Sequence, residues 1–151
     1  MSRAKMPTAG KLIACIVFGA VGFAVGTQAI ATLKEMSAIS YLAPLGAAVG
    51  AAVGWLVLGP DMTQGLMRGI SSGVKGAVFF AVNFLGIVGV VTMLRLTTRG
   101  RYGSPMEALT DAVAQAIDIG GQLATPEVLG TLVVGSMLAG WLGAAAWGRW
   151  Q

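Results

Sequence analysis

The stretch Tyr41–Gly59 reads YLAPLGAAVGAAVGWLVLG and contains no charged residue. Gly46, Gly50 and Gly54 recur at every fourth position, which places them on one stripe of an α-helix. In water, each interior glycine would weaken such a helix by roughly 0.5–1 kcal/mol relative to alanine. In a lipid bilayer, the same spacing lets a neighbouring helix approach until the backbones touch, as in small-xxx-small packing. The stretch therefore predicts a membrane-spanning helix that packs tightly against another helix.

The composition of the whole chain also indicates a membrane protein. Its 151 residues are 56% apolar and 11% charged, whereas soluble domains carry about 25% charged residues. The mean hydropathy is +0.78, the net charge is +4 and the pI is about 9.7. The basic residues flank apolar runs, where they fit membrane topology and contact with anionic lipid. We expect no nucleic-acid binding, because no basic face carries interleaved aromatic residues.

The residue types available for chemistry are few. Cys15 is the only cysteine, so an internal disulfide is excluded, and the chain contains no histidine. The commonest general base and metal ligand is therefore missing, which removes a Cys/His metal site and a Ser-His-Asp triad. We expect a protein that is not an enzyme and holds no cofactor or metal.

Four uncharged runs are long enough to cross a bilayer, at about residues 12–33, 41–59, 76–94 and 128–148. The first has 22 residues and would span about 33 Å, against a hydrocarbon core of about 30 Å. Thr27–Ala29 also resembles the end of a cleavable signal peptide, but the apolar run continues past it. The sequence predicts a single all-α membrane domain, residues 1–151, built as a four-helix bundle.

Two segments between the spans have a pattern of their own. Residues 61–72 form a polar link in which Met62, Leu66 and Ile70 recur every four residues. That spacing suits a short helix at the membrane interface, but Gly65, Gly69 and neighbouring Gly73 disfavour one. Residues 105–124 predict an amphipathic interfacial helix, which begins at Ser104 as N-cap with Pro105 at the first position. Its expected apolar face is Met106, Leu109, Val113, Ala116, Ile117, Gly120 and Leu123. This helix would either lie on the membrane or dock a partner.

The fourth span repeats the small-residue pattern. Gly135, Ala139 and Gly143 form one stripe, and Ser136, Gly140 and Ala144 form another beside it. These stripes, like the one at Gly46, would pack either within the bundle or against a second copy or another membrane protein. In the third span, Asn83 is the one strongly polar side chain, and it is suited to a hydrogen bond with a neighbouring helix.

The distribution of Lys and Arg favours one orientation. Four spans place the N-terminus, the 60–75 link and the C-terminus on one side of the membrane. That side carries six basic residues: Arg3, Lys5, Lys11, Arg68, Lys75 and Arg149. The other side carries four: Lys34, Arg95, Arg99 and Arg101. By the positive-inside rule, both termini are expected in the cytoplasm.

Arg95, Arg99 and Arg101 form the main cluster of charge, and they lie just before the helix that begins at Ser104. Guanidinium groups and free helix N–H groups together suit an oxyanion. The same arginines, at the end of a span, would also extend into the lipid headgroups and fix the depth of the helix. Both interpretations stay open at this point.

Several sequence blocks follow one another in a characteristic order. They are Met6–Leu12, Val53–Pro60, Arg101–Ala108, Pro126–Leu132 and Arg149–Trp150. In these blocks the chain resembles the TrgA-like tellurium (tellurite) resistance family of small multi-pass membrane proteins from alphaproteobacteria. That family usually starts at the Met-Pro-Thr block, which makes Met6 an alternative start to Met1.

The resemblance implies a stress-response protein of the bacterial inner membrane that is associated with tolerance of tellurite, and it supplies no mechanism. The alternative function is an accessory or scaffold subunit of a larger membrane complex, respiratory or photosynthetic. Four glycine-rich spans and the scarcity of catalytic groups suit that alternative. The expected partners are membrane lipid and, through the glycine-rich faces, a second copy or a larger complex.

Overall fold

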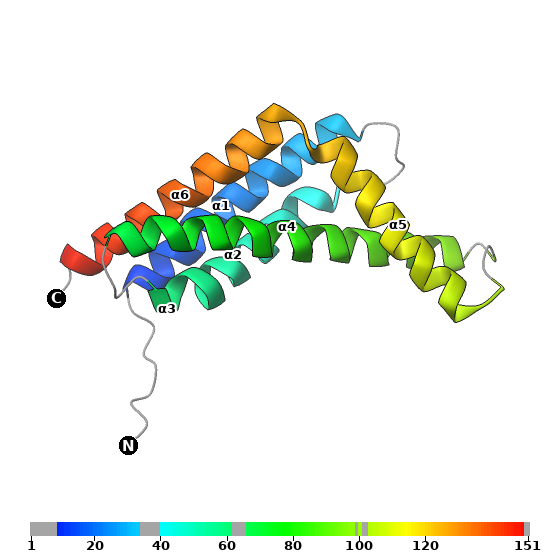
Figure 1. Ribbon diagram of the computed structural model, residues 1–151, viewed down its shortest axis with the longest axis horizontal. Coiled ribbons are helices and arrows are strands. Elements are labelled where there is room, and N and C mark those ends of the chain that lie inside the picture. Colours follow the sequence, from blue (N-terminus) through cyan, green and yellow to red (C-terminus); the bar gives the residue numbers. More distant parts are fainter. Residues whose placement is uncertain (1–8, 34–39, 62–65, 99, 101–102, 150–151) are drawn as a thin grey trace, which may run out of the picture.

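The computed structural model describes residues 9–33, 40–61, 66–98, 100 and 103–149. All regular structure in these ranges is helical (Figure 1). The helices are α1 (Ala9–Thr32), α2 (Leu42–Val53), η1 (Gly54–Leu58), α3 (Gly59–Asp61), α4 (Leu66–Thr97), α5 (Pro105–Leu123) and α6 (Pro126–Arg149). The predicted all-α helical bundle is confirmed.

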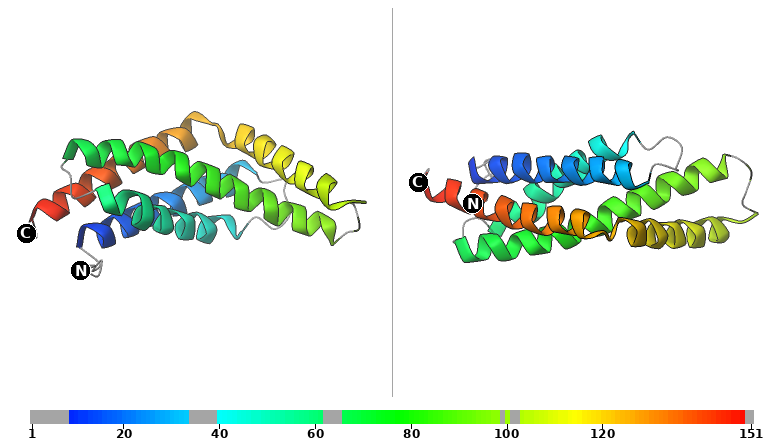
Figure 2. Two further views of the ribbon diagram at one scale, coloured as in Figure 1. Left: turned by 60° about the horizontal axis from the view of Figure 1, so that its bottom comes forward. Right: turned by 90° about the horizontal axis from the view of Figure 1, so that it is seen from above.

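Four stretches are long and apolar enough to cross a membrane: Gly10–Thr32, Leu42–Asp61, Met67–Thr97 and Pro126–Ala146. Successive stretches run in opposite directions, so that the start of α1 and the end of α6 lie at the same end of the bundle (Figures 1 and 2). The protein is thus a multi-pass membrane protein with an even number of spans in its described part.

The second span changes its helical geometry before it ends. α2 passes into the π-helical turn η1, in which the N–H of Gly59 bonds to the carbonyl of Gly54, and α3 then ends at Asp61. Pro60 therefore lies just inside the helix rather than after it. A wider turn suits this position, because a proline ring otherwise clashes with the carbonyl four residues earlier.

The third span begins earlier than the sequence predicts. α4 is continuous from Leu66, so most of the expected 61–72 link belongs to the helix. Gly69 and Gly73 lie inside this helix and face α6 rather than breaking it. Their low helix propensity is offset by close contacts with another helix, which propensity alone does not take into account.

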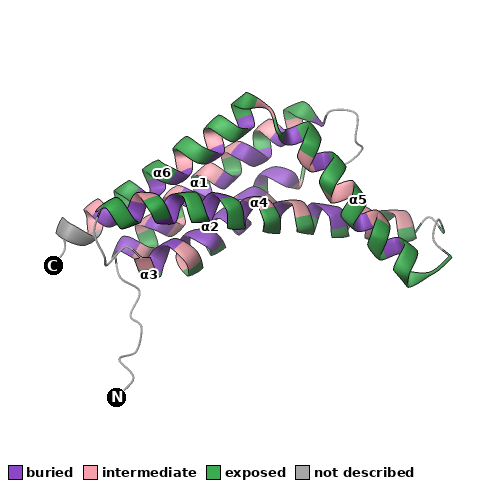
Figure 3. Ribbon diagram, viewed as in Figure 1, coloured by how far each residue is buried: buried purple, intermediate pink, exposed green. Residues whose placement is uncertain are grey.

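The core of the bundle is aromatic at its centre. Phe18 on α1 and Phe80 and Phe84 on α4 are all less than 3% exposed. Phe18 packs edge-on against Phe80 at 6.1 Å between ring centroids, and Phe80 stacks on Phe84 at 5.4 Å. Figure 3 shows the buried residues on the inner faces of the helices and the exposed ones outside. The exposed residues include many large apolar side chains, as a lipid-facing surface requires.

The helix α5 starts as predicted. The Oγ of Ser104 accepts a hydrogen bond from the N–H of Glu107 at 3.3 Å, and the Glu107 carboxylate accepts one from the N–H of Gly103 at 3.1 Å. The buried face of this helix differs from the apolar face expected from the sequence, with which it shares only Leu123. Ala108, Ala112, Ile119 and Leu123 are buried, whereas the large side chains Met106, Leu109, Val113 and Ile117 are 55–71% exposed.

The packing of α5 explains which of its side chains are buried. α5 contacts α4, and a Cβ at Gly89 would lie 2.7 Å from the carbonyl oxygen of Ala112. Small residues face α4 because they allow the two backbones to approach. The large apolar side chains point outward, where lipid can surround them, and the acidic side chains lie on a third face. This arrangement suits a helix at the membrane interface.

Candidate functional site

A very close backbone contact joins α1 and α2. A Cβ placed on Gly22 would overlap the carbonyl oxygen of Gly46, and a Cβ on Gly46 would overlap that of Gly22. Gly50 meets the backbone of Phe18 in the same way, and Gly54 would place a Cβ 2.6 Å from the Ala14 carbonyl oxygen. The stripe Gly46, Gly50 and Gly54 thus lies against a helix of the same chain.

A second close contact joins α4 and α6. A Cβ on Gly140 would overlap the carbonyl oxygen of Gly69, and one on Gly73 would overlap that of Ser136. A Cβ on Gly69 would lie 2.8 Å from the Cβ of Ala144. The stripe Ser136, Gly140 and Ala144 therefore faces α4. Gly69 and Gly73 on α4 have the same four-residue spacing as Gly46 and Gly50. That spacing is the sequence signal that could have identified α4 as the partner of this stripe.

The other stripe of α6 includes a residue that faces α1. A Cβ on Gly135 would lie 2.8 Å from Cγ1 of Val21 on α1. Ala139 is fully buried, and Gly143 is also buried. The two stripes of α6 thus serve two different neighbours, since α6 contacts both α1 and α4. Small residues on adjacent stripes let one helix approach two others closely.

The polar contact between spans involves Gln28 rather than Asn83. Gln28 Nε2 donates to Oγ1 of Thr131 at 2.9 Å, which links α1 to α6. Asn83 is exposed, and its Nδ2 donates to the carbonyl of Phe79 in its own helix at 2.8 Å. The side chains of Ser72 and Ser136 are fully buried. The Ser136 hydroxyl donates to the carbonyl of Leu132.

Arg95 is the one member of the arginine cluster within the described residues, and Arg99 and Arg101 lie outside them. Arg95 is in the last turn of α4 and is exposed. Its guanidinium carbon lies 4.9 Å from the centroid of the Tyr41 ring, a cation–π contact between the end of α4 and the start of α2. A planar guanidinium suits this stacking better than an ammonium does.

The N-terminus of α5 already holds an anion of its own. The Glu107 carboxylate accepts from Gly103, and Ser104 satisfies the N–H of Glu107. An external oxyanion at this helix end would therefore compete with a carboxylate that is part of the chain.

Few other groups in the described part suit ligand chemistry. Among those residues, no group of three or more Cys, Asp or Glu side chains comes close enough to hold a metal ion. Cys15 is half-buried on α1, and its Cα would lie 2.9 Å from a Cβ on Gly54. Asp61 and Lys75 form an ion pair at 3.6 Å near the start of α4. With the lysine side chain 63% exposed, this pair adds little stability.

Comparison with known proteins gives no match for this chain. The chain matches no protein-family model, no curated protein and no solved structure.

Proposed function

We propose that this protein is a non-enzymatic protein of the bacterial inner membrane that acts in tolerance of tellurite. The link to tellurite tolerance comes from the resemblance of the sequence to the TrgA-like family. The observation that supports a non-enzymatic role is the composition of the core. Its buried side chains in the described residues are apolar apart from Ser72 and Ser136. Proton relays and coupled transport use ionisable side chains inside the spans, and such a core does not support them.

The proposed orientation places both termini in the cytoplasm, because six basic residues lie on that side and four on the other. Arg95, Arg99 and Arg101 then face the periplasm, where tellurite arrives first. We propose that these arginines contact an oxyanion, either tellurite or the phosphate of a lipid headgroup. The two sources share one chemistry, a negatively charged oxygen that accepts from a guanidinium.

Growth on tellurite tests this proposal in a deletion strain restored with wild-type protein, with a triple Arg→Gln variant or with a triple Arg→Lys variant. We expect the deletion to sensitise cells and the wild-type gene to restore them. Loss of tolerance in both variants would assign the role to guanidinium groups, which bind oxyanions through two parallel hydrogen bonds. Tolerance in the Lys variant alone would assign it to positive charge at the headgroups.

Two outcomes would overturn parts of the proposal, given equal protein levels in the membrane. A deletion with no effect on tellurite tolerance removes the function. Full tolerance in the triple Arg→Gln variant removes the arginine site and leaves the function standing.

Asn83 favours the alternative, a subunit of a larger membrane complex. Its carboxamide is exposed on α4, beside Gly86, where a Cβ would meet no atom within 4 Å. A carboxamide that faces hydrocarbon leaves hydrogen-bonding groups unpaired, and a partner helix would satisfy them at about 1 kcal/mol or less.

Gentle detergent extraction tests the alternative. We expect the wild-type protein to migrate with a larger species and Asn83→Leu to shift it to the size of the free chain. Val90→Leu on the same exposed face is the control, because it changes shape without removing a polar group. Migration of the wild-type protein as a single small species would argue against this alternative.

A further inference from the structure

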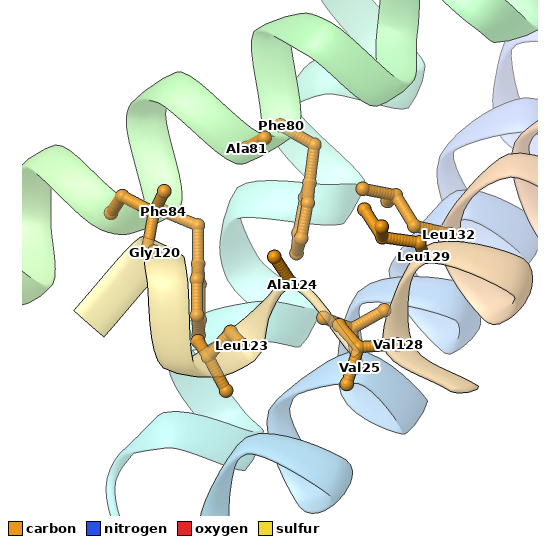
Figure 4. Close-up of a pocket in the computed structure, with 11 residues that line it drawn as sticks. Val25, Phe80, Ala81, Phe84, Gly120, Leu123, Ala124, Val128, Leu129 and Leu132 are labelled. Carbon is orange, nitrogen blue, oxygen red and sulfur yellow. The ribbon is translucent and has the colours of Figure 1, made fainter. Parts of the chain in front are cut away.

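We propose that a cavity at the junction of α5 and α6 binds a segment of a lipid acyl chain. The cavity has a volume of about 90 Å³ and lies between α1, α4, α5 and α6 (Figure 4). The rings of Phe80 and Phe84 extend into it from α4, and Leu123 and Val128 approach it from either side of the turn (Figure 4). This site is separate from the arginine cluster and does not depend on the proposed function.

The side chains that line the cavity favour an apolar occupant. The lining side chains are all hydrocarbon, from Val25, Phe80, Ala81, Phe84, Leu85, Leu123, Ala124, Val128, Leu129 and Leu132, with Gly120 completing the wall. A buried water molecule needs two to four polar partners, and a cavity without them stays dry. An unfilled cavity would forfeit the dispersion contacts of its lining atoms, so a hydrocarbon group is favoured there.

The position of the cavity indicates that the hydrocarbon group comes from membrane lipid. Its lining residues on α1, α4 and α6 all belong to stretches that can cross a membrane. Leu129 at its edge is 48% exposed and Ala124 is also exposed, so the cavity reaches the outer surface of the bundle. In a bilayer that surface meets acyl chains. The lipid that surrounds the protein therefore supplies the occupant.

The volume limits how much of a chain enters. At about 90 Å³, the cavity is smaller than an apolar cavity of roughly 150 Å³ that binds benzene, so only a short segment of a chain enters. Small residues keep this space open. A Cβ on Gly120 would already lie 3.0 Å from Cδ1 of Leu85, so a larger side chain there would close the opening.

Photolabelling of the full chain in phosphatidylcholine vesicles tests the proposal, with a trace of phosphatidylcholine that carries a diazirine on its acyl chain. Peptide mass spectrometry locates the adducts. We expect labelling at Leu85 and Leu129 that exceeds labelling at the exposed Val134. Ala81→Phe should reduce labelling at Leu85 and Leu129 several-fold, because the new ring fills the cavity. Val82→Phe, one residue away and 66% exposed, should leave it unchanged.

Either of two results would overturn the site: equal labelling at all outward-facing positions, or unchanged labelling at Leu85 and Leu129 in Ala81→Phe. Thermal unfolding in detergent checks that each variant is folded. If Ala81→Phe does not fold, Ala124→Phe fills the same cavity from the turn between α5 and α6 and gives the same readout.

Discussion

Replacing Gly46 with alanine is expected to destabilise the bundle by about 3 kcal/mol, the upper part of the range for an overpacked core. The added Cβ would overlap the carbonyl oxygen of Gly22 and lie 2.9 Å from its carbonyl carbon. Both of these atoms are backbone, so no side-chain rotation relieves the overlap and the helices must separate. Separation removes the close contacts along the α1–α2 interface, including the weak Cα–H···O type that adds perhaps 0.5–1 kcal/mol each.

Unfolding of the purified protein by SDS in mixed micelles, followed by the fluorescence of its four tryptophans, measures this effect. The control is Gly86→Ala on α4, where a Cβ meets nothing within 4 Å. That change is expected to leave stability unchanged or raise it by up to about 1 kcal/mol, since alanine favours the helix. Equal stability of Gly46→Ala and the wild-type protein would contradict the close contact between α1 and α2.

Replacing Phe18 with alanine is the second large change, and we expect a loss of about 2 kcal/mol. Phe18 is fully buried and packs edge-on against Phe80. In a bilayer the unfolded reference is also apolar, so the transfer term of a soluble protein largely disappears. The cavity term remains, at about 24 cal/mol per Å³ for a void of roughly 100 Å³.

Phe23→Ala on the same helix is the matched control, because Phe23 is 50% exposed and faces outward. Its removal leaves no internal void, and unfolding in SDS should show a change below about 0.5 kcal/mol. Equal losses for Phe18→Ala and Phe23→Ala would show that the aromatic core contributes no specific packing.

The sequence predicted the helices well because lipid imposes a simple demand on it. A helix that crosses hydrocarbon must be apolar along its whole length, so uncharged runs indicate it directly. The Gly46 stripe also predicted a close helix contact, since glycine weakens a helix and its gain at every fourth position is the close approach of another helix. Which helix it meets depends on three-dimensional arrangement, and the partner residues Gly22 and Phe18 emerged from the structure alone.

The errors in the sequence interpretation share a physical cause, the role of small residues in lipid. Gly69 and Gly73 were predicted to disfavour a helix because of their low helix propensity, but in α4 they contact α6 closely. The large apolar side chains of α5 were expected to meet the membrane or a partner, and Ile117, at 70%, is exposed. The apolar face expected for this helix left out the small residue Ala112, which is buried and lies against Gly89 of α4. In water large apolar side chains drive packing, whereas in lipid small ones do, because lipid chains are as apolar as leucine.

The candidate arginine site was predictable only as a cluster of charge. Spacing along the chain placed Arg95 at the end of a span, but its contact with Tyr41 joins segments far apart in sequence. No local pattern encodes that contact. The occupied N-terminus of α5 was predictable, since the Ser104–Glu107 capping pattern is written in the sequence.

The length of α4 carries the chain out of the hydrocarbon at both ends. The stretch Met67–Thr97 has 31 residues, against 20 to 23 in the other three. It extends about 46 Å, beyond a hydrocarbon core of about 30 Å, whereas its uncharged part, residues 76–94, extends only about 28 Å. Arg68 and Lys75 before this part and Arg95 after it therefore belong to turns of the helix that reach the two headgroup regions. The third span is thus held at both surfaces of the membrane by basic side chains of its own helix.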